Sequence, residues 1–364
     1  MLQVDNQTPF AAALSVFPDV QGVESAYLVV KATFAFTAEA PVLAPQQLPL
    51  LAADVYWGDP VQTSLRATGE FALPKPATDI LLVGHAVAPA PGTRVADVSV
   101  QVGPIRKTVR VFGERQWRRQ GSTWQPGEPA EWESMPLRWE LAFGGVVPGD
   151  EGQSARDWEP RNPVGRGLFD AEAAAKTRGF ELPPLPNLED PATLIGVHTH
   201  RPQPACFAPV APTWMPRRTY AGTYDEVWTK TRAPYLPQDF DARYFQLAPA
   251  GLVAPGYLQG GEPVELRGFT QGGPLKFDLP LLTLDASFHF DGKPQSRPLN
   301  LETVLFEPDA GRLQMLWRAG LAVDKKLLKL RSVKLRCAEY GKDGRAPAPL
   351  AAAGRGLPAQ YAAA

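Results

Sequence analysis

The chain of 364 residues has 37 Lys and Arg against 38 Asp and Glu, a net charge of −1, and 44% of its residues are apolar. A nucleic-acid-binding protein usually has a basic excess, so the charge balance argues against that class. The apolar fraction is sufficient for a sizeable core. The chain has two cysteines, Cys206 and Cys337, which are too few for a disulfide framework or a four-thiolate metal site.

The N-terminal segment MLQVDNQTPF lacks the basic start and apolar run of a secretory signal. No stretch of the sequence approaches the ~20 apolar residues that a membrane-spanning helix needs. We therefore expect a cytoplasmic protein that binds neither membrane nor nucleic acid.

Strand patterns dominate the first 120 residues. Apolar, β-branched and aromatic residues alternate with polar ones in short runs that Gly and Pro interrupt, which is typical of strands and turns. The runs predict strands at 25–38, 64–73, 80–87, 95–103 and 107–112. Short strands at such spacing favour an antiparallel sandwich or barrel-like scaffold over alternating strands and helices.

The sequence of the middle of the chain predicts mostly loop. Residues 120–135 are polar and predict a loop, whereas the alternation in 136–145 predicts a strand. The segment 171–176 is the best candidate for a helix, of two turns at most. Little other helix is expected, because 39 prolines are spread along the chain.

Strand patterns return in the last third, at 256–267, 273–284, 283–290, 299–306, 312–318 and 327–337. We expect one compact β-rich unit over 1–340, in which strand-rich ends, 1–120 and 256–340, flank a loop-rich middle, 121–255. The Ala-, Pro- and Gly-rich segment 341–364 predicts a disordered tail.

The stretch 204–245 has the most distinctive composition of the chain. It combines nine aromatic rings with six prolines and with charges of both signs. A flexible linker would have few rings, and burial of a ring removes roughly 150–250 Å² from water. We therefore expect an ordered, irregular segment in which some rings are core and others form a binding surface.

Motifs that would define an enzyme are missing from the sequence: no GxSxG elbow, HExxH, Walker loop or dinucleotide fingerprint occurs. His198 and His200 could hold a metal together with Cys206 and Asp190, but an ordinary loop is the better interpretation. A nucleophilic pair of Cys206 and His198 has no orienting motif beside it. We expect no metal and no cofactor.

Four carboxylates could act as the acid and base of a glycosidase, with the rings stacking on sugars: Glu140, Asp225, Asp239 and Asp241. The simpler interpretation is that nearby arginines pair with them to hold the loop: Arg217, Arg218, Arg232 and Arg243. A carbohydrate-active protein therefore stays as an alternative.

Seven segments occur together in a characteristic order: YWGDP (56–60), KPATD (75–79), MPLRWELAFGG (135–145), NPVGRG (162–167), AGTYDEVW (221–228), RAPYLPQDFDARYFQLAP (232–249) and GYLQGGEPVEL (256–266). In these, the sequence resembles a bacterial domain-of-unknown-function family encoded beside type VI secretion genes. The resemblance spans residues 1–340, and 221–249 is its most specific part.

The resemblance implies a non-catalytic adaptor, or chaperone, that loads a toxic effector onto the VgrG spike protein. Effector and VgrG would then be its partners, and stiff loops on a sheet would suit such binding. We expect six residues to lie near the partner-binding surface: Arg217, Arg218, Tyr224, Asp225, Trp228 and Arg232. A further alternative is a structural component of the baseplate or spike.

Overall fold

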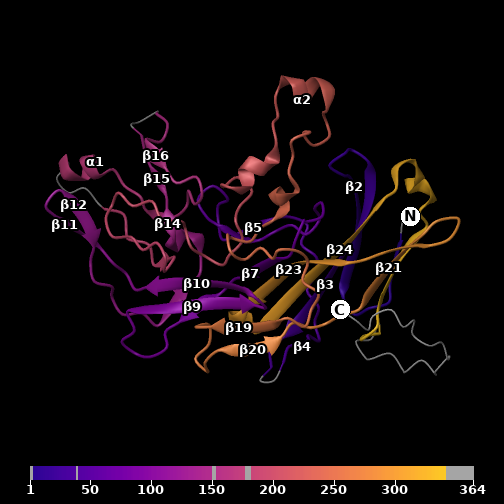
Figure 1. Cartoon of the computed structure of the whole chain (residues 1–364), viewed down its shortest axis with the longest axis horizontal. Coiled ribbons are helices and arrows are strands. Elements are labelled where there is room, and N and C mark those ends of the chain that lie inside the picture. The colour runs from indigo at the N-terminus through magenta and orange to yellow at the C-terminus, as the bar shows by residue number, and fades with distance from the viewer. Residues whose placement is uncertain (1–2, 38–39, 150–152, 177–181, 342–364) are drawn as a thin grey trace, which may run out of the picture.

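Three antiparallel-rich sheets form the body of the protein in the computed structural model, which describes residues 3–37, 40–149, 153–176 and 182–341 (Figure 1). The protein is mainly β, as the sequence predicts, and the sheets of the described residues form no closed barrel. The predicted tail, 341–364, lies outside the described residues from position 342 onward.

The largest sheet has six strands and is built around β3 (Glu24–Ala35). Its order is β2 (Ala11–Pro18), β3, β24 (Arg312–Ala322), β23 (Asn300–Glu307) and β7 (Asp79–Leu82), and β4 (Val42–Leu43) also pairs with β3. All these pairs are antiparallel except β23 with β7. Positions 25–34 of β3 are buried on both faces, which agrees with the unbroken apolar run at 26–30 and the absence of strict alternation.

A second sheet has five antiparallel strands in the order β18 (Leu188–Glu189), β10 (Ile105–Phe112), β9 (Val95–Val102), β19 (Pro263–Arg267) and β20 (Leu275–Asp278). The third has four strands in the order β1 (Gln3–Asn6), β25 (Ser332–Cys337), β21 (Leu284–His289) and β22 (Gln295–Arg297), with β1 and β25 parallel. Both sheets join strands from distant parts of the sequence.

Short elements make up the rest. The two-stranded pairs are β5 (Val55–Tyr56) with β6 (Leu65–Ala67), β8 (His85–Val87) with β13 (Ser134–Pro136), β11 (Trp117–Gln120) with β12 (Thr123–Pro126), β14 (Phe143–Gly144) with β17 (Arg166–Gly167), and β15 (Val146–Val147) with β16 (Asp157–Trp158). The α-helices are α1 (Ala171–Lys176) and α2 (Glu226–Thr231), and 3-10 turns lie at η1 (Trp139–Leu141), η2 (Arg217–Ala221), η3 (Ala242–Phe245), η4 (Pro308–Ala310) and η5 (Asp324–Lys329). The helix predicted at 171–176 is confirmed.

The main hydrophobic core takes residues from all three sheets and from both strand-rich ends of the chain. Phe34, Phe207, Phe288 and Phe306 are among its fully buried side chains. A smaller cluster around Trp117 and Phe169 lies near α1, β11 and β12, at one end of the molecule in Figure 1. The extent of a single unit over 1–340 stays a prediction.

The strand predicted at 136–145 is wrong. Only its ends are extended, as parts of β13 and β14, and a 3-10 turn lies between them. The turn directs the indole of Trp139 inward, where Nε1 donates to the carbonyl oxygens of Ala208 and Pro209 at 3.1 and 3.0 Å. The conformation of this segment is therefore set by tertiary hydrogen bonds and not by its alternation of apolar and polar residues. The predicted loop at 120–135 is also partly wrong, because it contains β12.

Asn162 connects two of the motif segments. Its side chain is fully buried, and Nδ2 donates to the carbonyl oxygens of Trp139 and Phe143 at 2.7 and 3.0 Å. A Cβ on Gly144 would lie 2.0 Å from the Asn162 carbonyl oxygen, so no side chain fits there. The segments LRWELAFGG and NPVGRG are thus two halves of one close-packed junction.

Candidate functional site

A projecting segment, residues 217–245, is the most prominent surface feature, and we call it the arm. It begins at η2 and ends at η3, and α2 lies at its tip, standing out from the sheets beside β2 (Figure 1). Pro216 precedes this segment and Pro234 and Pro237 follow α2, and α-helix is limited to the six residues of α2, in agreement with the expected ordered, irregular structure.

Asp225 fixes the start of α2. Its Oδ1 accepts a 2.8 Å hydrogen bond from the Trp228 backbone N–H, which satisfies one of the donors left free at a helix N-terminus. The Tyr224 and Trp228 rings meet edge to face with their centroids 4.7 Å apart. The Trp228 Nε1 donates to the Tyr235 carbonyl oxygen at 2.8 Å, which ties the two sides of the arm together.

Arg232 and Tyr235 anchor the arm to the turn between β2 and β3. The Arg232 guanidinium donates to the carbonyl oxygens of Val20 at 2.6 Å and Leu236 at 2.8 Å. The Tyr235 ring packs so closely on Gly22 that a Cβ there would lie 3.2 Å from it. The tip is therefore held against the body of the protein.

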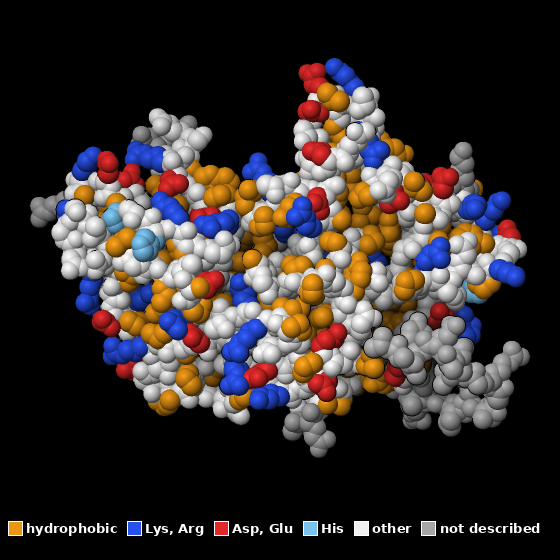
Figure 2. Space-filling model, viewed as in Figure 1, with side chains coloured by type: hydrophobic (Ala, Val, Ile, Leu, Met, Phe, Trp, Pro, Cys, Tyr) orange, Lys and Arg blue, Asp and Glu red, His pale blue; other side chains and the backbone are white. Residues whose placement is uncertain are grey.

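The arm leaves three large hydrophobic side chains partly in solvent. Tyr224 is 54% exposed, Val227 66% and Tyr235 42%. Charged side chains lie among them, including the exposed pair of Glu226 and Lys230 (Figure 2). Exposed rings and aliphatic groups on a held segment, bordered by charge, are typical of a protein-binding surface.

The structure brings together four of the six predicted site residues, Tyr224, Asp225, Trp228 and Arg232, at the tip of the arm. Arg218 is exposed at the base. Arg217 is different: it is buried, and its guanidinium donates to the carbonyl oxygens of Tyr244, at 3.0 Å, and Val210. It lies buried at the base of the arm.

Each of the four carboxylates considered for catalysis has a structural partner. Asp239 accepts from the backbone N–H and hydroxyl of Thr223, and these hydrogen bonds lower its pKa. Asp241 pairs with Arg243, and Glu140 accepts from the N–H and hydroxyl of Ser64. Asp225 caps α2. No pocket described in the structure is lined by two of them.

Only one of the predicted arginine–carboxylate pairs therefore forms, that of Arg243 with Asp241. Arg217 and Arg232 bind carbonyl oxygens instead. The loops of this region have few backbone ladder partners, so arginines satisfy their carbonyl groups directly.

The residues considered for a metal site or a nucleophilic pair each have a different environment. The Nδ1 atoms of His198 and His200 face the backbone N–H groups of Trp124 and Gly196, at 3.2 and 3.1 Å. Cys206 is fully buried in the main core, and burial raises its pKa to about 12. Within the described part of the chain, no group of three or more His, Cys, Asp or Glu residues is arranged to hold a metal ion.

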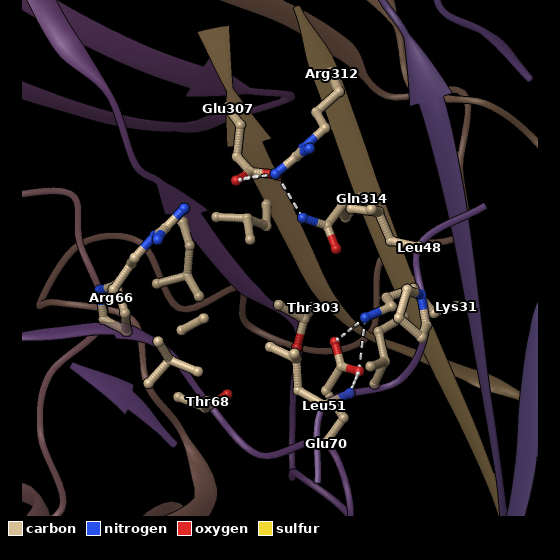
Figure 3. Close-up of a pocket in the computed structure, with 17 residues that line it drawn as sticks. Lys31, Leu48, Leu51, Arg66, Thr68, Glu70, Thr303, Glu307, Arg312 and Gln314 are labelled. Carbon is tan, nitrogen blue, oxygen red and sulfur yellow. Dashed lines mark hydrogen bonds and ion pairs between the residues drawn. The ribbon is translucent and has the colours of Figure 1, made fainter. Parts of the chain in front are cut away.

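A pocket of about 330 Å³ opens over the six-stranded sheet, and we call it the sheet pocket (Figure 3). Four of its five charged side chains form two ion pairs, and the fifth, Arg66, lies over the Trp57 ring. Lys31 Nζ lies 2.8 Å from both carboxylate oxygens of Glu70. The Arg312 guanidinium donates two hydrogen bonds to the Glu307 carboxylate, which also accepts one from the Gln314 side chain. Leucines and prolines line the space between the two ion pairs.

Buried ion pairs continue along the same sheet. Lys75 Nζ lies 2.6 Å from Asp79, and Arg318 Nε lies 2.8 Å from Glu302. Asp79 also accepts from the Leu247 backbone N–H at 2.8 Å, which fixes the chain just after the arm. Sequence reasoning missed this group of charges, although the KPATD segment contains both Lys75 and Asp79.

A family model described as an uncharacterized protein conserved in bacteria (DUF2169) matches residues 21–318. The chain therefore belongs to this family. No match was found among curated proteins or among solved structures. No helix in the described ranges is long and apolar enough to cross a membrane.

Proposed function

We propose that this protein is a non-catalytic adaptor of a type VI secretion system, which binds a toxic effector and presents it to the VgrG spike protein. The arm would be its partner-binding surface. The observation that carries the proposal is the exposure of Tyr224 and Val227 on a segment that is capped by Asp225 and anchored to the body by Arg232. The family resemblance supplies the class of partner.

The physical properties of the arm suit this role. Because Arg232 and Trp228 already hold its conformation, little conformational entropy remains to be lost on binding. The exposed rings supply apolar contact area, and surrounding charges would set orientation and partner choice. A net charge of −1 leaves little long-range repulsion of other proteins.

Co-expression with the effector and VgrG encoded beside the gene tests the proposal. The effector should be captured with the wild-type chain at physiological salt. The double variant Tyr224→Ala/Val227→Ser should weaken the complex by about 30-fold or more, because an interface hot spot contributes at least about 2 kcal/mol. Recovery of no effector by the wild-type protein would contradict the proposal.

A matched control removes similar apolar groups elsewhere on the surface. Val61 and Leu281 are 86% and 62% exposed and lie outside the arm. The double variant Val61→Ser/Leu281→Ser should bind the effector as the wild type does. Equal loss in both double variants would show that the arm is not the binding surface.

Mass spectrometry of purified secretion particles separates an adaptor from a baseplate or spike component. An adaptor should be depleted from the assembled particle, whereas a structural component should be retained at fixed stoichiometry. The carbohydrate hypothesis gains no support from the geometry, because all four carboxylates have structural partners.

A further inference from the structure

A second pocket, of about 290 Å³, lies beneath the arm and shares a wall with the sheet pocket. We call it the Arg217 pocket. Arg217, Tyr244 and Phe245 line it from the arm, Arg318 from the sheet, Asp54 from just before β5, and Phe71 from the loop between β6 and β7. It therefore lies at the junction of the arm with the body.

Arg217 is exceptional among the buried cations of the described residues. Four of the five have a carboxylate within ion-pair distance: Lys31 with Glu70, Lys75 with Asp79, Arg115 with Glu189, and Arg318 with Glu302. Arg217, only 7% exposed, has carbonyl oxygens as its hydrogen-bond acceptors. A buried charge without a counter-ion is costly, because carbonyl groups carry only partial charge.

No buried carboxylate of the described residues is left over to neutralise Arg217. Asp79 is paired with Lys75 and accepts two backbone N–H groups, and Glu302 is paired with Arg318. Burial lowers the pKa of Arg217, since the surrounding negative groups are too distant to offset its desolvation. A counter-charge from outside the described chain would remove this imbalance.

The guanidinium of Arg217 still has donors to offer. Nε donates to the Tyr244 carbonyl oxygen and Nη1 to that of Val210. Nη2 has no hydrogen-bond partner among the described residues, and it is not one of the fully buried side-chain atoms that lack a partner. The Tyr244 ring lies 5.4 Å from the guanidinium carbon. An acceptor entering the pocket could therefore reach Nη2 beside an aromatic wall.

The remaining lining defines the chemistry of the ligand. Phe71, Tyr244 and Phe245 offer apolar and aromatic surface for its body. The Asp54 carboxylate also lines the space, where its Oδ1 accepts from the Gly69 N–H, and it would repel a multiply charged anion such as phosphate. The Glu70 carboxylate nearby is occupied by Lys31. These features favour a single negative charge on an apolar body.

We propose that the Arg217 pocket binds a monocarboxylate with an aromatic or aliphatic body, whose carboxylate pairs with Arg217. The same chemistry occurs in a free organic acid and in the apolar C-terminal residue of a protein. Occupancy would join the base of the arm to the sheet through one ion pair. This inference does not depend on the adaptor function, because it requires neither effector nor spike.

Titration calorimetry of the purified full-length chain with 3-phenylpropionate tests the site, and the neutral 3-phenylpropionamide serves as the matched ligand. The acid should bind and the amide should not. Arg217→Lys should weaken binding by about 10- to 100-fold, the value of a charge-assisted hydrogen bond. Arg218→Lys, which changes the exposed neighbour, should leave binding unchanged.

Ala53→Trp provides an independent variant, because Ala53 lines the pocket, an indole there would fill it, and Arg217 is retained. It should abolish binding while its thermal unfolding stays close to that of the wild type. A peptide ending in phenylalanine, with a free or an amidated terminus, distinguishes the two sources. Binding of the free-terminus peptide alone assigns a protein C-terminus, and binding of 3-phenylpropionate alone assigns a free acid.

Three results would overturn the inference. The first is binding of neither 3-phenylpropionate nor the free-terminus peptide to the wild-type chain. The second is equal affinity for acid and amide, or for acid and inorganic phosphate. The third is undiminished binding by both Arg217→Lys and Ala53→Trp.

Discussion

Arg232 Nη2 donates a 2.6 Å hydrogen bond to the carbonyl oxygen of Val20, which precedes it by 212 positions in the sequence. The guanidinium also reaches the carbonyl oxygens of Gln21 and Leu236. One side chain thus links the arm, at its far side, to the turn between β2 and β3. The arm is a braced loop rather than a free one.

Removal of that brace should loosen the arm. We expect Arg232→Ala to speed amide hydrogen exchange at 224–236 strongly, while the thermal midpoint changes little, because the hydrogen bonds are partly exposed and lie outside the core. Hydrogen exchange with mass spectrometry measures both the arm and the sheets. Lys230→Ala is the control, since its exposed pair with Glu226 is worth only about 0.3–0.5 kcal/mol. Unchanged exchange in Arg232→Ala would mean that α2 is held by other contacts.

The buried pair of Glu302 and Arg318 offers a sharper test of stability. Glu302→Ala leaves Arg318 buried without its carboxylate and removes the acceptor of the Lys75 N–H, so the free energy of unfolding should fall by about 3–5 kcal/mol. Urea denaturation monitored by tryptophan fluorescence gives this value.

The double variant Glu302→Leu/Arg318→Met separates the pair from the individual groups. It should recover a large part of the loss, because apolar side chains of similar volume avoid the desolvation of both charges. A loss of unfolding free energy equal to the sum of the losses in Glu302→Leu and in Arg318→Met would show that the two charges do not couple.

The thiol of Cys206 should make the protein sensitive to alkali. Burial raises its pKa to about 12 in the folded chain, against about 8.5 for an unperturbed thiol. Between these values the unfolded thiol is deprotonated and the folded one is not, so unfolding releases a proton and stability is lost as the pH rises. The contribution reaches about 1.4 kcal/mol per pH unit.

Comparison with Cys206→Ala isolates this effect, because Cys337 and the tyrosines are common to both proteins. The free energy of unfolding of the variant should fall less steeply from pH 9 to pH 11. Identical slopes would mean that Cys206 ionises in the folded chain, and rapid reaction of Cys206 with a thiol reagent at pH 8 would agree with that outcome.

Local pattern predicted the elements whose hydrogen bonds come from regular ladders. The helix at 171–176 and the strands at 95–103 and 107–112 match α1, β9 and β10 closely. The segment 136–145 has an equally clear alternation, yet its conformation follows from the partners of Trp139 and Asn162, which are distant in sequence. Pattern cannot identify such partners.

The candidate site was predictable to a similar degree. The unusual composition of 204–245 identified the arm. The helix α2 within it was not predicted, because only two apolar residues, Val227 and Trp228, follow its cap Asp225 in a six-residue helix. The burial of Arg217 could not be predicted, because it depends on Tyr244 and Val210 closing around the side chain. Lys75 and Arg318 also acquire their roles only when the sheet forms.

The pairing of β3 with β24 has a consequence for synthesis of the protein. Ala35 pairs with Arg312, so the ribosome must produce residues 36–311 before β24 can begin to pair with the central strand. At 5–20 residues per second this takes roughly 15–55 s. Throughout that interval an aggregation-prone apolar strand is left open on the nascent chain, which makes this fold a natural client of the cell's general folding machinery.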